Sequence, residues 1–501
     1  MSDRTAVPPA RPNRLLAALL SGWEPAPAAF IARKPYYPWL VVGASCIAAF
    51  MGQLDASIVQ LALPALEHQF HSHLGAVSWV AIAYQLAVVS ILPVYARLAE
   101  ITGRKLMYFA GFILFALASL LCGLATGLPW LIAFRALLGL AAAMVGANSV
   151  IIMVKAAGPA RQGRAMGILA AVQAIGVSVG PVTGGLLLAS LGWHWVFWVN
   201  IPFAIAAAVI TWLVIPKTTG LSADRRFDWR GAIVLMPALT ALLLLISESF
   251  TWGPASPAIL GCAIAAVALL ALFIRQESRT PAPLLDLQLF RNGAFAGGIV
   301  AIVVSYALLY GMFFLMSFAL VRGYHDSPLT AGLRLAIVPV ALGIVAPFSG
   351  GLHDRLGARA VLPGGMAICT AAIILLSQQL TGSPSSLLGV MAALAGFGAG
   401  LGLFIAPNNS ATLSAAPADR HGQAGGLLNL MRIFGTSLGV AAASAMLSWR
   451  FDARTGLGDH TMGAPEQGLL GGVADAMWLL VAFAVVAGLT SILRGPKRVA
   501  T

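Results

Sequence analysis

The sequence predicts an all-α polytopic membrane protein, and three observations support this class. Only 9% of the 501 residues are charged, whereas 59% are hydrophobic and the mean hydropathy is +0.89. Soluble domains usually carry about 25% charged residues. Apolar runs of about 20 residues, long enough for a helix to cross a bilayer, recur from Trp39 onward. Because these runs are continuously apolar rather than alternating, they exclude a β-barrel.

The distribution of basic residues predicts the topology. With 14 spans and a cytoplasmic amino terminus, 24 of the 30 Lys and Arg residues fall in cytoplasmic segments. The outer loops hold three, namely Arg322, Arg450 and Arg454, and three more lie within spans, namely Arg135, Arg334 and Arg432. This asymmetry follows the positive-inside rule, so the net charge of +13 indicates topology rather than nucleic-acid binding. We expect a multi-pass protein of a bacterial cytoplasmic membrane with both termini in the cytoplasm.

An internal repeat predicts two similar halves. Residues 96–105 follow the second span and residues 350–359 follow the tenth, and both have the skeleton small-x-Leu-x-acid-x-x-Gly with basic residues. Two repeats of six helices are a common plan of secondary transporters. The predicted segments are a cytoplasmic basic tail (1–37), a six-helix half (38–216), a linker with two additional transmembrane helices (217–292), a second six-helix half (293–494) and a cytoplasmic tail (495–501).

Four local patterns carry a family resemblance. They are Leu54-Asp-Ala-Ser-Ile-Val-Gln-Leu-Ala-Leu-Pro64, the repeated loop, Arg135-Ala-Leu-Leu-Gly139, and the glycine-rich stretch from Gly176 to Gly185 with the following residues 192–202. Together they resemble the fourteen-span drug:proton antiporter branch of the major facilitator superfamily, the EmrB/QacA-like exporters. The resemblance implies the major-facilitator fold, in which two six-helix bundles are joined here by two inserted helices.

Two ionisable residues form the predicted proton-coupling site. Asp55 lies in the first span and Arg135 in the fourth, and both lie within about 8–14 Å of the outer helix ends at the helical rise of 1.5 Å per residue. Charges in the hydrocarbon region usually pair, face a cavity or relay protons. A carboxylate stays ionised beside an arginine and takes up a proton when it is desolvated without one. We therefore expect Asp55 and Arg135 to couple proton binding to conformational change, with a static structural pair as the alternative.

The fifth span is predicted to be a close-packing, bendable helix. Gly176, Gly180 and Gly184 are spaced by four and share one helix face, and Gly185 extends this small-residue pattern. Pro181 removes one backbone hydrogen bond. We expect the span to pack against a helix of the other half. The resemblance implies that this motif marks exporters, whereas simple helix packing is the alternative.

The repeated loop is a predicted inner gate. Its residues are Glu100, Gly103, Arg104 and Lys105 in the first copy, and Asp354, Arg355, Gly357 and Arg359 in the second. We expect the acids to accept hydrogen bonds from helix ends, the basic residues to bridge to acids across the interface, and the glycines to permit tight turns. The first copy departs from the family pattern at Ala96, Glu100 and Ile101. Topology alone would also place basic residues here.

The substrate cavity is expected near the ninth span. Tyr306, Tyr310 and Phe314 lie on one face of that span, and flexible or aromatic surfaces suit varied lipophilic compounds. Helix packing is the commoner reason for such a stripe. Arg432 is a further cavity or gate candidate. Glu248 and Asp475 are candidates for binding a cationic substrate, although snorkelling to the membrane interface explains them equally well.

The predicted function is proton-coupled export of lipophilic drugs or toxic compounds, cationic ones included. The sequence contains no nucleotide-binding loop, no metal cluster and no arranged nucleophile and base, so we expect no cofactor beyond the proton gradient and no enzyme activity. The expected partners are a small lipophilic substrate, protons and membrane lipids, without nucleic acid, for a transporter that works as a monomer. The need for a periplasmic adaptor stays open. The alternatives are a dedicated exporter of one metabolite, lipid or siderophore, and a non-transporting membrane sensor or scaffold.

Overall fold

A computed structural model describes residues 24–158, 161–218, 229–249, 252–253, 255–280, 287–417, 420–458 and 465–493. Every regular element in these ranges is a helix. Thirteen of the helices are long and apolar enough to cross a membrane, and Ile233–Ser247 forms a shorter apolar helix. The prediction of an all-α polytopic protein is therefore confirmed, with a helix number close to the predicted 14.

The helices form two similar sets with a hairpin between them. The first set contains α3 (Tyr37–Gln69), α4 (Leu74–Thr102), α5 (Arg104–Gly123), α6 (Leu128–Ala157), α7 (Gln162–Ser190) and α9 (Asn200–Val214), with the short α2 (Ala29–Ala32) and α8 (His194–Trp198). The hairpin consists of α10 (Trp229–Ser247) and α11 (Pro257–Glu277). The second set contains α12 (Gly293–Phe318), α14 (Ile337–Leu356), α15 (Ala358–Gln379), α16 (Leu387–Ser414), α17 (His421–Thr455) and α18 (Glu466–Leu493). Shorter elements in it are η2 (Leu287–Arg291), η3 (Ala319–Gly323), α13 (Pro328–Leu335) and η4 (Pro384–Ser386).

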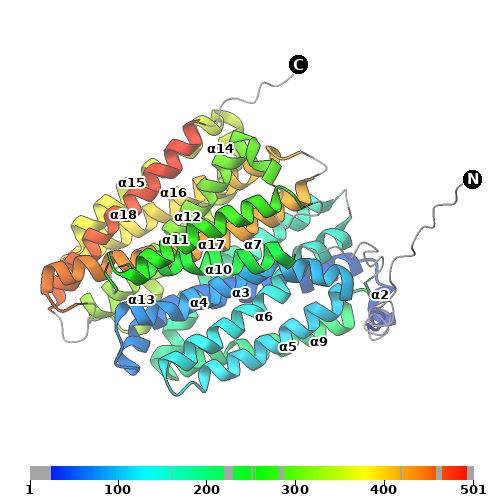
Figure 1. Ribbon diagram of the computed structural model, residues 1–501, viewed down its shortest axis with the longest axis horizontal. Coiled ribbons are helices and arrows are strands. Elements are labelled where there is room, and N and C mark those ends of the chain that lie inside the picture. Colours follow the sequence, from blue (N-terminus) through cyan, green and yellow to red (C-terminus); the bar gives the residue numbers. More distant parts are fainter. Residues whose placement is uncertain are drawn as a thin grey trace, which may run out of the picture.

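The two sets repeat the same pattern of neighbours. In the first set α3 packs on α7, α4 on α6, and α5 on both α6 and α9. In the second set α12 packs on α17, α14 on α16, and α15 on both α16 and α18. Figure 1 shows α5, α6 and α9 of the first set on the lower side of the molecule and α14, α15, α16 and α18 of the second set on the upper side. The two sets are thus equivalent bundles of six helices.

Helix boundaries follow from local capping chemistry. Ser256 and Ser327 each precede a proline and accept a hydrogen bond from the backbone amide three residues later, at the starts of α11 and α13. Proline suits the first helical position because its missing amide hydrogen has no partner there. Asn292 caps α12 by accepting a hydrogen bond from the Ala294 amide. Such caps fix where each membrane-crossing helix begins.

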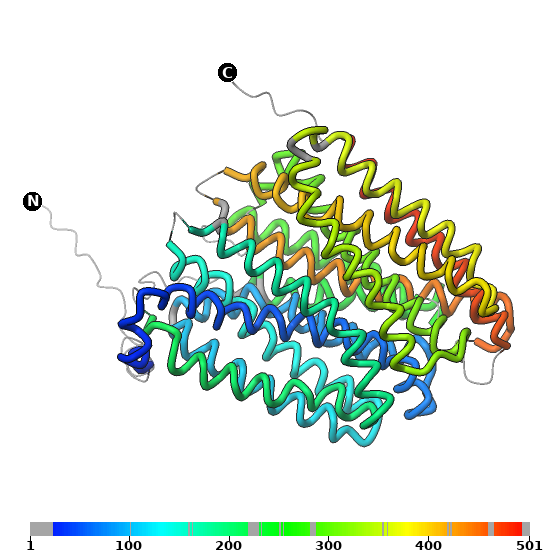
Figure 2. Tube along the Cα trace, turned by 180° about the vertical axis from the view of Figure 1, so that it is seen from behind, coloured from blue at the N-terminus to red at the C-terminus, as the bar shows by residue number. Residues whose placement is uncertain are grey.

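The hairpin covers one side of the contact between the two bundles. Helix α10 packs against α4 of the first bundle, α17 of the second and its own partner α11. Helix α11 is largely exposed, since only 17% of its apolar 18-residue stretch is buried inside the protein. On another side, α7 contacts α13 and α14 of the second bundle. Figure 2 shows α7, in turquoise, running between the two bundles in the view from behind.

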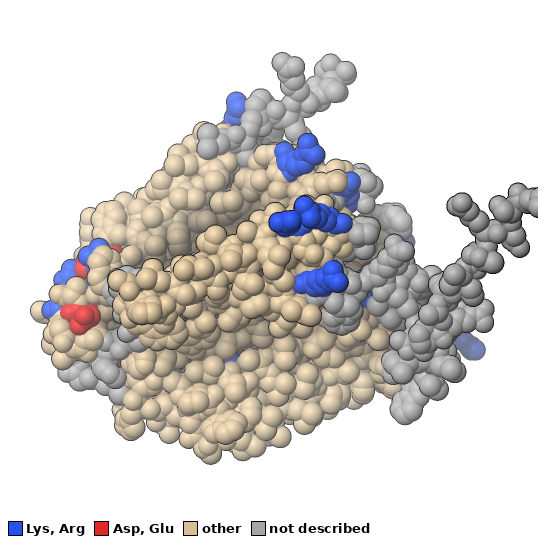
Figure 3. Space-filling model, in the orientation of Figure 1, with Lys and Arg blue, Asp and Glu red and all other residues tan. Residues whose placement is uncertain are grey.

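Charged side chains on the visible surface avoid the belt around the middle of the molecule. In Figure 3 most visible Lys and Arg side chains gather at one end, side chains of both signs lie at the opposite end, and the belt between them is nearly free of charge. An apolar belt flanked by polar ends is what a bilayer requires of a protein that crosses it.

The predicted topology can be tested with two single cysteines. Leu457, after α17, and Leu356, at the end of α14, are 45% and 60% exposed, and the topology places them on opposite sides of the membrane. We expect an impermeant maleimide to label Leu457→Cys on intact cells and Leu356→Cys only after permeabilisation. The background must lack the native cysteines Cys46, Cys122, Cys262 and Cys369. Labelling of both sites from the cytoplasm would contradict 14 spans.

Candidate functional site

A buried ion pair lies inside the first bundle. Arg135 Nη1 on α6 donates to Asp55 Oδ2 on α3 at 2.7 Å, and the two side chains are 1% and 0% exposed. The second carboxylate oxygen, Asp55 Oδ1, accepts a hydrogen bond of 3.1 Å from Nδ2 of Asn200 on α9. The structure thus brings together the two residues that the sequence predicts at similar depth, and it adds a third that the sequence analysis missed.

The guanidinium of Arg135 makes further contacts with α4. Its Nε donates to the backbone oxygen of Val80 at 2.8 Å, and its carbon atom lies 4.3 Å from the centre of the Tyr84 ring. An aromatic face attracts a cation that is removed from water. Asp55 and Arg135 therefore join α3, α4, α6 and α9. Opening the pair would leave buried charges without compensation, so its state is linked to the packing of four helices.

A cavity lies beside the ion pair, between the two bundles. Tyr84 lines it and separates it from Arg135. Other lining residues carry amide, hydroxyl or guanidinium groups, namely Gln53, Gln85, Ser149, Gln173, Tyr306, Tyr310, Asn429, Arg432 and Thr436. Apolar side chains of α3, α4, α5 and α6 form much of the remaining wall. An apolar pocket with a few polar groups is the usual form of a small-molecule site.

The structure places the predicted cavity residues in two different regions. Tyr306, Tyr310 and Arg432 line the cavity, as expected. Phe314 does not line it, because its ring packs on Phe318 in the buried core of α12.

Neither predicted acidic residue reaches the cavity. Glu248 accepts a hydrogen bond from Nε1 of Trp79 where α10 ends, and the carboxylate of Asp475 pairs with Arg454 at 2.7 and 2.9 Å. The prediction that they bind a cationic substrate is corrected, since both already have partners elsewhere.

Amide side chains of the cavity were missed by the sequence analysis. Gln53, Gln85, Gln173 and Asn429 lie in the middle of long apolar helices. An uncharged polar residue at that depth needs a hydrogen-bonding partner, as a charged one does, although leaving it unpaired costs less free energy. Tyr310 satisfies Gln53 by donating to its Oε1 at 3.1 Å, across the two bundles. Glutamine within a membrane span is therefore the signal that could have located this site.

The glycine face of α7 packs against α3 of the same bundle. A Cβ atom at Gly176 would lie 2.9 Å from the Phe50 oxygen, and one at Gly184 would lie 2.9 Å from Cγ1 of Ile58. At Gly180 a Cβ would lie 2.8 Å from Cβ of Ser57 and closer to its hydroxyl oxygen. These three glycines thus face α3, whereas the predicted packing of the span against the other bundle is confirmed by the contact of α7 with α13 and α14. Their missing side chains let α3, which carries Asp55, approach α7 closely.

The contact of α7 with the other bundle is made by neighbouring residues. A Cβ at Gly185 would lie 2.9 Å from Cα of Leu329 in α13, and one at Gly332 would lie 3.0 Å from the carbonyl carbon of Pro181. Helix α7 is thus packed on both sides through small residues. A shift of α3 would therefore displace α7 against α13, because such close backbone contacts leave little room for adjustment.

The outer helix ends also join the bundles. Arg322 Nη2 donates to Glu67 Oε2 at 3.1 Å and to the Pro64 oxygen at 3.4 Å. Ser444 Oγ on α17 donates to the oxygen of Leu74 on α4 at 3.5 Å. In the predicted topology these residues lie on the outer side, so the bundles are closed there. Nearby, Asp326 pairs with Arg334; burial raises the pKa of Asp326, and the arginine partly offsets this rise.

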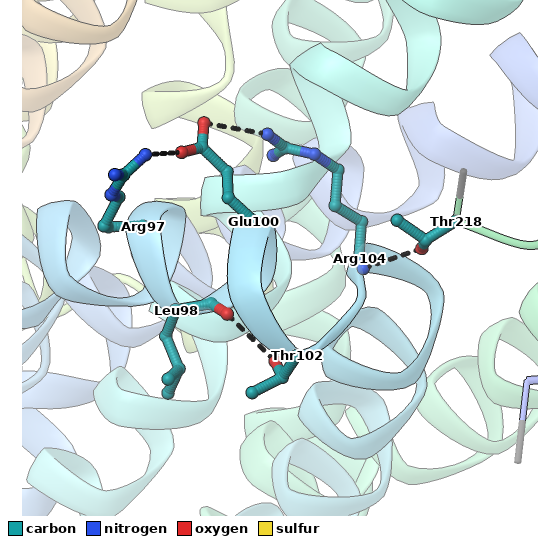
Figure 4. Close-up of polar contacts among 6 residues, drawn as sticks. All are labelled: Arg97, Leu98, Glu100, Thr102, Arg104 and Thr218. Carbon is teal, nitrogen blue, oxygen red and sulfur yellow. Dashed lines mark hydrogen bonds and ion pairs between the residues drawn. The ribbon is translucent and has the colours of Figure 1, made fainter. Parts of the chain in front are cut away.

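The first copy of the repeated loop contains a local charge cluster (Figure 4). Glu100 accepts hydrogen bonds from Arg97 and Arg104, both on its own loop segment. The backbone amide of Arg104 donates to Oγ1 of Thr218 at 2.9 Å. The expected bridges of Arg104 and Lys105 to acids across the interface are not what the structure has, since Lys105 Nζ donates to the backbone oxygen of Pro25 at 2.9 Å.

Glu24 fastens this loop to the segment before α3. Its side chain is buried, and Oε1 accepts from the Leu106 amide at 3.0 Å and from Thr218 Oγ1 at 3.1 Å, while Oε2 accepts from the Thr218 amide at 2.7 Å. A carboxylate at the amino end of α5 is favoured by the helix dipole. Gly103 has φ +113°, and a Cβ there would overlap Glu24. The tight turn predicted at Gly103 is confirmed, and the acid that it accommodates comes from an unexpected part of the chain.

The second copy differs from the first. Gly357 has φ +78°, which confirms the predicted turn, and the side chains of Arg355 and Arg359 are exposed. The side chain of Asp354 lies outside the described residues. The two copies therefore share a backbone turn but differ in their surroundings, because only the first copy meets Glu24 and Thr218.

Comparisons with known proteins agree with this architecture. The profile of the Major Facilitator Superfamily matches residues 45–440. The riboflavin transporter RibZ of Clostridioides difficile (strain 630) is 30% identical over 423 residues, which are 84% of this chain and 91% of that protein. The multidrug resistance protein Stp of Mycobacterium tuberculosis (strain ATCC 25618 / H37Rv) is 33% identical over 412 residues, 82% of this chain and 76% of that one. A bacterial homologue of the human lysosomal transporter Spinster shares the fold, with a TM-score of 0.63 at 17% identity over 92% of this chain and 97% of that one.

Replacement of Gly180 by alanine is expected to destabilise the protein. The new methyl group meets Ser57, and overpacking of this kind lowers the free energy of unfolding by about 1–3 kcal/mol. Gly167→Ala is the matched control, because it lies on the same helix with nothing within 4 Å of the added Cβ. The control also reports the intrinsic gain in helix propensity from glycine to alanine. Thermal unfolding in detergent measures both, and equal midpoints would contradict the close contact of α7 with α3.

Removal of the Glu24 carboxylate is expected to loosen the loop between α4 and α5. Glu24→Ala leaves the amides of Leu106 and Thr218 without their acceptor. Each buried amide that stays unpaired lowers the stability by about 1–3 kcal/mol. Lys34→Ala, at an exposed position nearby, serves as the control. Hydrogen exchange of a peptide covering residues 103–108 should accelerate in Glu24→Ala alone. Unchanged exchange would show that Glu24 does not hold the loop.

Proposed function

We infer the function from the family, since this chain belongs to the Major Facilitator Superfamily of membrane transporters. We propose that it is a proton-coupled antiporter of the fourteen-span EmrB/QacA-like branch, which exports lipophilic compounds across the cytoplasmic membrane. The observation that supports this most is the buried pair of Asp55 and Arg135 beside the central cavity.

Proton coupling needs a carboxylate whose two forms favour different packing. Ionised Asp55 neutralises Arg135 at 2.7 Å. A protonated, neutral Asp55 leaves the arginine with a backbone oxygen and an aromatic ring as partners. An uncompensated charge in the hydrocarbon region is costly, so α3 and α6 then favour an arrangement that exposes Arg135 to water. Export follows if that arrangement opens the cavity to the outside.

Asn200 can form a hydrogen bond with both the ionised and the protonated form of Asp55. Its amide nitrogen donates to the ionised carboxylate, and its Oδ1 atom is buried without a hydrogen-bond partner in the described part of the chain. After a half-turn of the amide, Oδ1 can accept a hydrogen bond from a protonated carboxyl group. We assign Asn200 the role of a positioning residue that keeps Asp55 in place through the proton cycle.

A second candidate function is transport of one dedicated metabolite. The similarity to a riboflavin transporter favours it, because 84% of this chain aligns with that protein. The amide-rich cavity wall also suits a substrate with many hydrogen-bonding groups. Growth-inhibition assays with a panel of drugs, with and without the expressed protein, separate the two. Resistance to several unrelated compounds supports the multidrug exporter, and resistance to none supports the dedicated carrier.

Neutralisation of Asp55 tests the proposal. Asp55→Asn keeps the size and hydrogen bonding of the side chain but cannot release a proton, so substrate-induced proton release from reconstituted vesicles should be lost while substrate binding survives. Asp475→Asn is the matched control, because this carboxylate is paired with Arg454 away from the cavity. Arg135→Lys should retain part of the activity, since lysine lacks the planar fork. Full proton release by Asp55→Asn would place the coupling carboxylate elsewhere.

A further inference from the structure

The central cavity carries positive charge. Among its lining residues the side chain with a formal charge is Arg432, and neither aspartate nor glutamate occurs in that set. The wall otherwise offers amides, hydroxyl groups and apolar side chains. A bound molecule therefore meets an arginine and no carboxylate, which is the opposite of what a lipophilic cation requires.

The partners of Arg432 are neutral. Its Nη1 donates to Gln173 Oε1 at 2.7 Å, its Nη2 donates to Asn429 Oδ1 at 2.6 Å, and its guanidinium carbon lies 5.8 Å from the centre of the Tyr306 ring. These groups satisfy N–H donors but supply no counter-charge. An unneutralised charge at membrane depth is costly, and an anion that enters the cavity would remove that cost.

The acids that could neutralise Arg432 are engaged elsewhere. Asp55 pairs with Arg135 behind Tyr84, and Glu67 pairs with Arg322 at the outer helix ends. Asp475 pairs with Arg454. Arg432 thus differs from each of these arginines, because its partners among the described residues are amides and a ring rather than a carboxylate.

We propose that the transported substrate is an acidic aromatic or lipophilic compound whose carboxylate, sulfonate or phenolate binds Arg432. This inference rests on the proposed export function and names its substrate class. The planar guanidinium matches a carboxylate in two parallel hydrogen bonds. The ring system lies against Tyr306 and Tyr310, and the apolar wall takes up the rest of the molecule. Cationic compounds are disfavoured by like-charge repulsion and by the absence of a carboxylate in the described wall.

The same geometry links binding to movement of the bundles. Gln173 belongs to α7 of the first bundle and Arg432 to α17 of the second, so their hydrogen bond joins the two. A substrate anion replaces Gln173 Oε1 as the acceptor of Arg432 and so releases this link. Export of an anion against entry of protons also moves positive charge inward in both steps, which an inside-negative membrane potential favours.

The experiment uses three probes that share one aromatic body. They are 2-naphthoate, its neutral methyl ester and (2-naphthylmethyl)trimethylammonium, with binding to the full chain in detergent measured by equilibrium dialysis against protein-free micelles. For the unchanged protein we expect naphthoate to bind at least about tenfold more tightly than the ammonium compound, as a charge-assisted hydrogen bond implies. Arg432→Gln should lose this preference with ester binding unchanged, and Arg432→Lys should keep most of it. Arg454→Gln, at an arginine outside the cavity, should behave as the unchanged protein.

A second variant keeps the experiment informative if Arg432→Gln misfolds. Gln173→Glu places a carboxylate where Arg432 already has an acceptor, so it should neutralise the arginine and abolish the preference for naphthoate while retaining Arg432. Equal binding of the anion and the cation by the unchanged protein, or a preference that survives Gln173→Glu, would overturn the inference.

Vesicle transport separates this inference from the proposed function. Proton-linked export of the ammonium probe that depends on Asp55 would overturn the substrate class and leave the antiporter intact. Naphthoate binding that follows Arg432 without any proton movement would support the substrate class and overturn proton coupling.

Discussion

The central constraint of this protein is the cost of a charge in an apolar interior. Asp55 and Arg135 are both almost fully buried, so each requires the other, and the 2.7 Å pair holds α3 against α6. Asn200 and the Val80 carbonyl take up the remaining hydrogen-bonding capacity and bring in α9 and α4. The contacts of this one ion pair therefore join four helices of the first bundle. In proteins, replacement of a buried ion pair by apolar side chains of similar size is often neutral or stabilising, so stability alone does not account for this pair.

Small residues of α7 connect α3, the helix that carries Asp55, to the boundary between the bundles. Gly176, Gly180 and Gly184 bring α7 against α3, and the close approach of Gly185 to Leu329 and of Gly332 to Pro181 continues the contact into α13. Gly176, Gly185 and Gly332 face backbone atoms, which cannot adjust to a displacement by changing rotamer as side chains can. The outer closure at Arg322 and Glu67 lies at the end of the same helices. Asp55 and the outer contact of Glu67 with Arg322 are thereby connected through one continuous set of contacts.

Much of the fold and the centre of the site could be predicted from the sequence, because both rest on apolar runs and on charges that such runs do not tolerate. Asp55, Arg135 and Arg432 stand out for that reason, and the glycine turns at Gly103 and Gly357 follow from the motif. The partner of the α7 glycines could not be predicted, since spacing gives a helix face but not its neighbour. Phe314, Glu248 and Asp475 were misplaced because aromatic and acidic residues near helix ends have alternative partners that only the packing determines. Glu24 was missed because nothing local marks a residue that bonds to amides more than 80 positions away.

The two buried arginines, Arg135 beside the cavity and Arg432 in its wall, have different electrostatic surroundings. Arg135 is neutralised by a carboxylate of the same bundle, and in the proposed mechanism its charge becomes exposed when Asp55 takes up a proton. Arg432 has amide partners, one of them in the other bundle, so its charge is available to whatever occupies the cavity. A proton and a substrate anion then act on the two arginines in opposite senses, since the proton removes a counter-charge and the anion supplies one. With Asp55 ionised and the cavity empty, only Arg432 is uncompensated. An anion alone compensates both arginines, whereas a proton alone leaves both uncompensated. This difference gives the protein a physical reason to bind the substrate before it accepts the proton.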